Sequence, residues 1–104
     1  MSYGRIGVIG AMDSELAALI AALAQPAQET VQGLIFHTGR LGAREVVLVR
    51  CGIGKVSAAR CTQVLIDRFA PGAVINTGIA GAVHHDLKVL DVVISRELCY
   101  HDFN

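Results

Sequence analysis

The strongest constraint in this sequence is a pattern that occurs twice: a short apolar segment, a turn of small residues, and a segment in which apolar side chains recur at helical spacing. The first copy starts at residues 6–10, and the second starts at residues 45–50 and continues through the glycine turn at residues 51–55. Strands that are apolar on both faces are typical of sheets covered on both sides. The pattern therefore predicts an α/β fold with parallel strands.

Two helices are expected within these units. The first has one apolar face, made by four residues at helical spacing: Leu16, Leu19, Ile20 and Leu23. Asp13 or Ser14 can cap its first turn, and Pro26 marks its end. The second helix is expected over about residues 55–69 and ends before Pro71. Its apolar face is made by Ala58, Cys61, Leu65 and Phe69.

Further strands are predicted in four segments, at residues 33–37, 45–50, 73–77 and 89–95. Residues 39–44 are expected to form a hairpin loop between two of them. A chain of 104 residues without a linker or a repeat suits one domain over residues 1–104. The expected architecture is a mixed, mostly parallel sheet flanked by helices.

Three turns of small residues are expected to meet at one edge of this sheet. They lie at residues 10–12, 51–55 and 77–81, each directly after a predicted strand. Open α/β sheets bind ligands beyond the carboxyl ends of their strands. Because glycine and alanine let a ligand approach the backbone closely, this edge is the predicted binding site.

Composition and charge disfavour several partners. With 9 basic and 9 acidic residues, the formal net charge is zero, which argues against binding to a nucleic-acid backbone. No apolar run approaches the roughly 18 residues of a membrane span, and the N-terminus lacks a signal-peptide layout. The three cysteines form no C-x-x-C pair, so we expect buried thiols in a reducing cytoplasm.

Phosphate-binding and metal-binding motifs are not satisfied. Gly54-Lys55 resembles part of a P-loop, but Val49 and Val56 occupy positions that require glycine and serine or threonine. The dinucleotide fingerprint is also missing, so an uncharged nucleoside fits these turns better than a nucleotide. The residues that could suggest a metal are His84, His85, Asp86, His101 and Asp102. Their spacing is not that of a metal site, so we expect no metal.

Glu15 is the most informative carboxylate in the chain. It falls in the first turn of the first predicted helix, at the predicted binding edge. One role is a favourable interaction with the helix N-terminus, worth about 0.3–1 kcal/mol. The other is that of a general base that activates water. Position alone favours the first role and leaves both open.

Taken together, four segments resemble the signatures of the 5′-methylthioadenosine/S-adenosylhomocysteine nucleosidases. They lie in the same order as in that family, at residues 6–15, 51–56, 76–81 and 100–102. The resemblance implies a nucleoside-phosphorylase-like fold, usually in a homodimer. It also implies hydrolysis of the N-glycosidic bond without a cofactor, which releases adenine in methionine salvage.

The resemblance also implies roles for individual residues. It makes Glu15 the group that orients or deprotonates the attacking water. It places five residues along the ribose and the alkylthio group: Met12, Ile53, Ile79, Ala80 and Gly81. Ile79 stands where the family often has a small hydroxyl residue, so this chain lacks that hydrogen bond.

Length separates this chain from the family, whose members are considerably longer. The acid that protonates adenine is expected outside residues 1–104. We therefore expect the chain to be the N-terminal half of a longer enzyme or to need a partner, and to show no turnover alone. Two alternatives remain: a related hydrolase of another purine nucleoside such as futalosine, and a non-catalytic module that binds nucleoside or dimerises. A phosphorylase is disfavoured because residues 77–81 contain no basic phosphate ligand.

Overall fold

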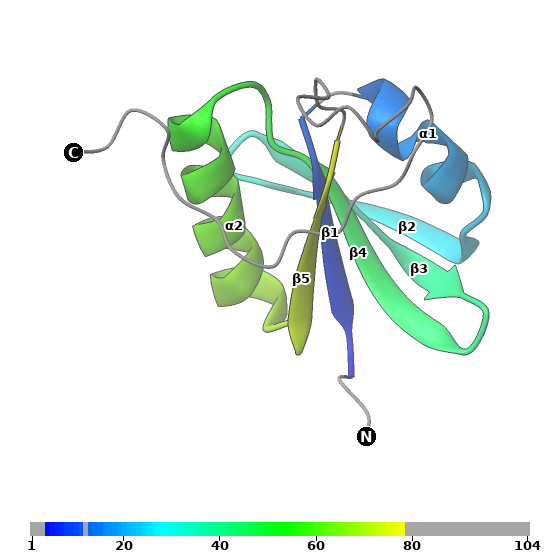
Figure 1. Cartoon of the computed structure of the whole chain (residues 1–104). Coiled ribbons are helices and arrows are strands. Elements are labelled where there is room, and N and C mark those ends of the chain that lie inside the picture. Colours follow the sequence, from blue (N-terminus) through cyan, green and yellow to red (C-terminus); the bar gives the residue numbers. More distant parts are fainter. Residues whose placement is uncertain (1–3, 12, 79–104) are drawn as a thin grey trace, which may run out of the picture.

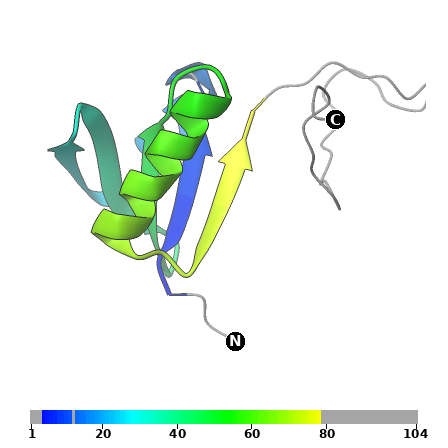
Figure 2. The ribbon, with the colours of Figure 1, turned by 90° about the vertical axis from the view of Figure 1, so that its left-hand side faces the viewer.

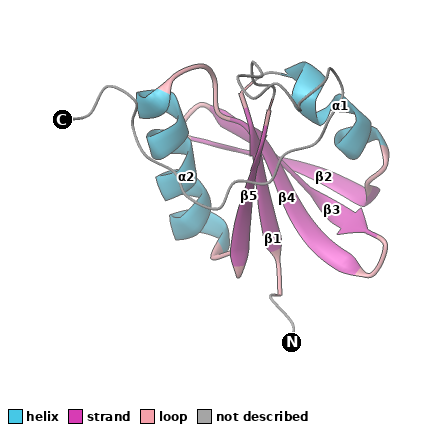
Figure 3. Ribbon diagram, viewed as in Figure 1, coloured by secondary structure: helices cyan, strands magenta, loops and turns pink. Residues whose placement is uncertain are grey.

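The computed structural model describes residues 4–11 and 13–78, without the side chain of Glu15. In this part of the chain, five strands form one sheet in the order β2-β3-β4-β1-β5 (Figures 1 and 3). Along the chain the elements are β1 (Ile6–Gly10), α1 (Asp13–Ala21), β2 (Ala24–Val31), β3 (Leu34–Leu41), β4 (Arg44–Arg50), α2 (Lys55–Phe69) and β5 (Ala73–Thr77).

The sheet is mixed, as the sequence predicts. β1 pairs in parallel with both β4 and β5. β3 pairs antiparallel with both β2 and β4, because short turns join these strands and leave no room for a crossover. The parallel pairs join β1 with the strands directly before and after α2, which confirms the predicted α/β class.

The helices cover opposite faces of the sheet, and Figure 2 shows α2 lying across one of them. Side chains alternate along β4, so Val47 and Val49 face α2 whereas Val46 and Leu48 face α1. The core under α2 contains Ile9, Leu34, Phe36, Val47, Val49, Cys61, Val64 and Leu65. The core under α1 contains Ile6, Val8, Leu16, Leu23, Val46 and Leu48. Each fully buried aliphatic side chain contributes about 1.5–3 kcal/mol, so the two cores hold the elements in place.

The predicted bounds of β1, α2 and β5 agree with the structure. The first helix is shorter than predicted: it ends at Ala21, although Leu23 still packs in the core. The loop predicted at residues 39–44 is also too long, because β3 continues to Leu41 and β4 starts at Arg44. A two-residue turn therefore suffices, and Gly42 supplies the positive φ of 64° that it requires. The strand predicted at residues 89–95 lies outside the described residues.

The sequence analysis does not predict β2. This strand lies at the edge of the sheet and is mostly exposed, so it needs no apolar alternation. Its pairing with β3 shifts register between Ala24 and Ala27, and Gln25 has a φ of 54° there. Pro26 fits this bulge because a proline at an irregular edge position removes no required ladder hydrogen bond.

Side chains of α2 fasten this hairpin to the rest of the fold. Arg68 forms an ion pair with Glu29 of β2, in which Nη2 donates to Oε1 over 2.8 Å. About two turns earlier in α2, Arg60 donates to the backbone oxygen of Gln32. These contacts hold β2 and the turn after it against α2. Neither described helix has the length and the apolar character needed to cross a membrane.

Gly7 allows α2 to approach β1 closely. A Cβ at this position would lie 2.7 Å from Cδ2 of Leu65, which is fully buried. No such contact is sterically permitted, so an added methyl group would displace Leu65 or the helix. The missing side chain of Gly7 is therefore part of the packing between α2 and β1.

We predict that Gly7→Ala destabilises the full-length protein by about 1–3 kcal/mol, because it overpacks the core under α2. Leu65→Ala should destabilise it by about 2–5 kcal/mol through a cavity. In the Leu65→Ala background the added methyl group has room, so Gly7→Ala should cost markedly less. Chemical denaturation of the four proteins measures this coupling; equal costs in both backgrounds would contradict the packing role of Gly7.

A second prediction concerns residues 1–104 expressed alone. Val74 and Ile75 of β5 are 40% and 53% exposed, and β5 ends the described sheet. Exposed apolar edge strands favour association. We expect residues 1–104 to sediment as a self-associated species, and Val74→Thr with Ile75→Thr to reduce that association. A monomer that melts cooperatively without these substitutions would refute the prediction.

Candidate active site at the carboxyl edge of the sheet

The parallel register brings three turns to one edge of the sheet. Gly10, the last residue of β1, is paired with Arg50 of β4 on one side and Thr77 of β5 on the other. The backbone N–H of Cys51 donates to the carbonyl oxygen of Gly10 over 2.8 Å, so the turn after β4 is attached to the end of β1. The structure thus confirms that the described starts of the three turns converge (Figure 1).

The first turn of α1 borders the same edge. The helix begins at Asp13, which places the backbone of Glu15 in this turn. The side chain of Glu15 lies outside the described part of the structure, and so do Met12, Ile79, Ala80 and Gly81. The roles expected for these residues therefore remain predictions. Ile53 is described, and its exposed fraction of 78% leaves it accessible in the turn between β4 and α2.

A cavity of about 520 Å³ opens at this edge. Its volume is in the range of pockets that bind small ligands. The cavity is surrounded by α1, the start of β3 and the turn after β4. Its described lining consists of Ala11, Asp13, Leu16, Ile20, Gly33, Leu34, Ile35, His37, Arg50, Cys51, Gly52 and Ile53. Ile53, one of the residues expected along the ribose and the alkylthio group, thus lines a cavity at the predicted edge.

Three polar side chains at the cavity, those of Asp13, His37 and Arg50, are not among the predicted site residues. Arg50 Nε lies 3.5 Å from Asp13 Oδ1, and His37 lines the same hollow. Asp13 was considered only as a helix cap, and Arg50 only as the end of a strand. The sequence contains one signal for a role of Arg50 at the site: it is a charged residue at the end of a buried strand, directly before a glycine turn.

The two described cysteines differ in environment. Cys51 lines the cavity, and its thiol donates to the carbonyl oxygen of Gly52 over 3.1 Å. Cys61 lies in the core under α2, where burial, with a smaller contribution from nearby Cys51, raises its pKa to about 11. Neither forms a disulfide within the described residues, and the environment of Cys61 makes its thiol unreactive.

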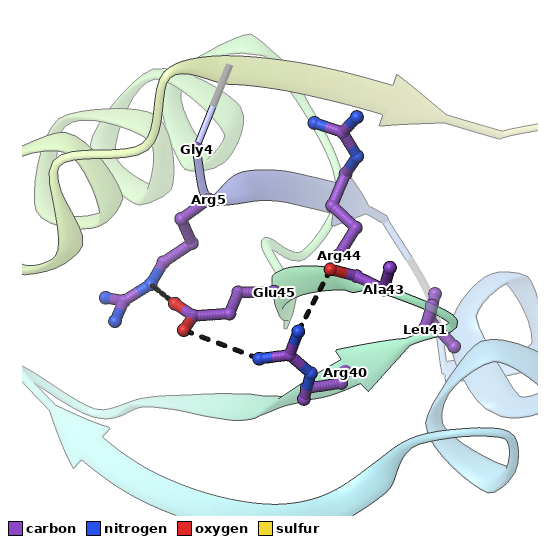
Figure 4. A pocket seen from close by; sticks show the side chains of 7 residues that line it. All are labelled: Gly4, Arg5, Arg40, Leu41, Ala43, Arg44 and Glu45. Carbon is purple, nitrogen blue, oxygen red and sulfur yellow. Dashed lines mark hydrogen bonds and ion pairs between the residues drawn. The ribbon is translucent and has the colours of Figure 1, made fainter. Parts of the chain in front are cut away.

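A second hollow, of about 560 Å³, lies at the opposite, amino edge of the sheet (Figure 4). There Arg5 and Arg40 point toward Glu45, with N–O distances of 3.6 and 3.8 Å, whereas Arg44 points away from it. Arg5 also donates to the carbonyl oxygen of Phe69 and stacks over its ring. These contacts join β1, β4 and the end of α2, so we interpret this cluster as structural.

The described residues contain no group of three His, Cys, Asp or Glu side chains that could hold a metal ion. The residues weighed as metal ligands in the sequence are His84, His85, Asp86, His101 and Asp102, and all lie outside the described residues. Within residues 4–11 and 13–78, the polar groups that line the cavity at the carboxyl edge include a carboxylate, a guanidinium, an imidazole and a thiol.

Comparison with known proteins agrees with this arrangement. The family model of the phosphorylase superfamily matches residues 5–104. The chain belongs to the phosphorylase superfamily. Its fold is shared by a solved relative, a 5′-methylthioadenosine/S-adenosylhomocysteine nucleosidase from Colwellia psychrerythraea 34H in complex with adenine. That structure matches with a TM-score of 0.81 and 45% identity, over 83% of this chain and 36% of that chain.

Other members of the superfamily match as well. The 5′-methylthioadenosine/S-adenosylhomocysteine nucleosidase of Bacillus thuringiensis (strain Al Hakam) is 52% identical over 98 residues, which are 94% of this chain and 42% of the relative. A mutant of the futalosine hydrolase of Helicobacter pylori matches with a TM-score of 0.73 and 30% identity, over 85% of this chain and 40% of that chain. This chain thus spans less than half the length of the curated relative. The family model confirms the expected superfamily.

The reactivity of the Cys61 thiol tests whether the core under α2 is closed to reagents. At pH 8, a pKa of about 11 leaves on the order of one thousandth of Cys61 as thiolate. We predict that Cys61 of the folded, full-length protein resists iodoacetamide at this pH and reacts once the protein is unfolded in guanidinium. Peptide mass mapping identifies the modified site, and native alkylation at the unfolded rate would contradict the burial of Cys61.

Proposed function

We propose that the protein formed with this chain hydrolyses the N-glycosidic bond of 5′-methylthioadenosine and S-adenosylhomocysteine, and that residues 1–104 supply its water-activating half. The observation that carries the proposal is the register at the carboxyl edge. Gly10 lies between Arg50 and Thr77 there, and the first turn of α1, which contains Glu15, borders it. Relatives that share this arrangement are named for these two nucleosides.

The proposed reaction transfers the ribosyl group from adenine to water. The bond between C1′ and the adenine nitrogen breaks, and its electron pair leaves with adenine, which takes up a proton. Glu15 accepts a proton from the water whose oxygen attacks C1′. The transition state resembles an oxocarbenium ion, so a carboxylate near C1′ stabilises it.

Each described segment of the edge has a part in this proposal. The turns after β1 and β4 are small, so ribose can lie against their backbone. Ile53 offers apolar surface to the alkylthio group. The acid that protonates adenine is expected in the part of the enzyme beyond residues 1–104. Ile79 is proposed to contact the sugar through its methyl groups alone.

Further properties follow from the same proposal. We place the enzyme in the cytoplasm as a homodimer, without a cofactor, and its adenine-releasing reaction in methionine salvage. A related purine nucleoside is the second candidate substrate, because a futalosine hydrolase shares the fold at 30% identity. A non-catalytic nucleoside-binding or dimerisation module is the third possibility. Assays of adenine release from the two adenosine thioethers, with futalosine as a comparison, separate the three.

The decisive substitution is Glu15→Gln in the full-length protein. It keeps the shape of the side chain and removes the base, so we predict that the rate of adenine release falls about 10²–10⁴-fold. Binding of 5′-methylthioadenosine, measured by calorimetry, should change by less than about threefold, because the amide still fills the same space.

Asp67→Asn serves as the matched control. Asp67 lies near the end of α2, where its side chain accepts a hydrogen bond from Gln63 far from the carboxyl edge. This variant should retain adenine release. Full turnover by Glu15→Gln would refute the role of Glu15. Loss of binding with the reaction rate of bound nucleoside preserved would assign Glu15 to binding instead.

A further inference from the structure

An ion pair lines the cavity at the carboxyl edge and adds little to the fold. Arg50 Nε lies 3.5 Å from Asp13 Oδ1, and both residues line the cavity of about 520 Å³ together with Ile53. The Arg50 side chain is 59% exposed and the Asp13 side chain 83%, so water screens their attraction. Exchanging one partner for a group of a ligand therefore costs little.

The backbone on both sides of this pair is held firmly. Arg50 ends β4, whose preceding residues Val46 to Val49 are buried, and its backbone is paired with Gly10. Asp13 begins α1, which is anchored in the core by Leu16, 1% exposed. The backbone that carries each of the two charged side chains is thus held in place beside the cavity. Such fixed positions lower the cost of binding a charged group.

The two nucleosides of the proposed function differ in one substituent. In 5′-methylthioadenosine the sulfur carries a methyl group, which needs apolar surface alone. In S-adenosylhomocysteine it carries a chain that ends in an ammonium group and a carboxylate. At neutral pH this end is a zwitterion, and each of its charges needs a partner when it leaves water. An opposed pair of charges beside an apolar wall satisfies both requirements.

We propose that Arg50 and Asp13 form the subsite for the amino-acid end of S-adenosylhomocysteine, with Arg50 binding the carboxylate and Asp13 the ammonium group. This inference rests on the proposed function and adds a specificity determinant to it. A guanidinium donates two parallel N–H bonds to a carboxylate, so the contact is both strong and specific in its geometry. Ile53 lines the same cavity as the pair, so its apolar side chain is available to the methylene groups of the chain.

The test compares the two nucleosides in the full-length protein. Arg50→Gln should lower the ratio of kcat/KM for S-adenosylhomocysteine to kcat/KM for 5′-methylthioadenosine roughly tenfold, mainly through KM, because the contact is remote from the reacting atoms. Arg50→Lys should restore part of the ratio, since it keeps the charge but not the planar fork. Asp13→Asn should lower the same ratio by a smaller factor.

Arg44→Gln is the matched control. It removes the same charge from the other end of β4, where Arg44 lines the hollow at the amino edge, so the ratio should stay constant. Calorimetric binding of both nucleosides gives the same ratio without turnover. An equal effect of Arg50→Gln on both nucleosides, in rate and in binding, would overturn the subsite. If the unsubstituted protein releases no adenine, the proposed hydrolysis fails, whereas the binding ratio still decides the subsite.

Discussion

The parallel pairing of β1 with β4 is the contact on which the rest of this structure depends. Both strands are buried along most of their length, and side chains from both reach the cores under α1 and α2. A strand covered on both faces cannot shift its register by one residue without moving every side chain to the wrong core. Gly7 adds a further restraint, because its missing side chain brings α2 close to β1.

This fixed register also separates the two ends of the sheet chemically. At the amino edge, Arg5 and Arg40 converge on Glu45 and connect strands that would otherwise end in solvent. At the carboxyl edge the turns are small, and the charged groups Arg50 and Asp13 line a cavity together with apolar side chains of α1 and β3. Within the described residues both edges have a charged hollow, but the one at the carboxyl edge has the larger apolar lining, which a nucleoside requires. Its large apolar side chains are Leu16, Ile20, Leu34, Ile35 and Ile53.

The sequence predicts element bounds correctly where the element has an apolar run or an apolar face. β1 and β5 are apolar strands in sequence, and α2 is a helix with one apolar face, so the bounds of all three follow from the sequence. β2 has no such pattern because it lies exposed at an edge, so its pairing with β3 decides its conformation. The first helix was predicted too long for a similar reason: Leu23 is buried, as a helical stripe suggests, but it packs from the segment after the helix.

The sequence by itself determined the α/β class and the superfamily, and it placed small turns and Glu15 directly after neighbouring strands, because buried strands, glycine turns and Glu15 are local features of the chain. It did not determine which charged side chains would meet at that edge. Asp13 and Arg50 are far apart in the sequence and belong to different elements, and neither residue type is specific on its own. Only the packing of α1 against β4 brings them within 3.5 Å of each other, beside the cavity.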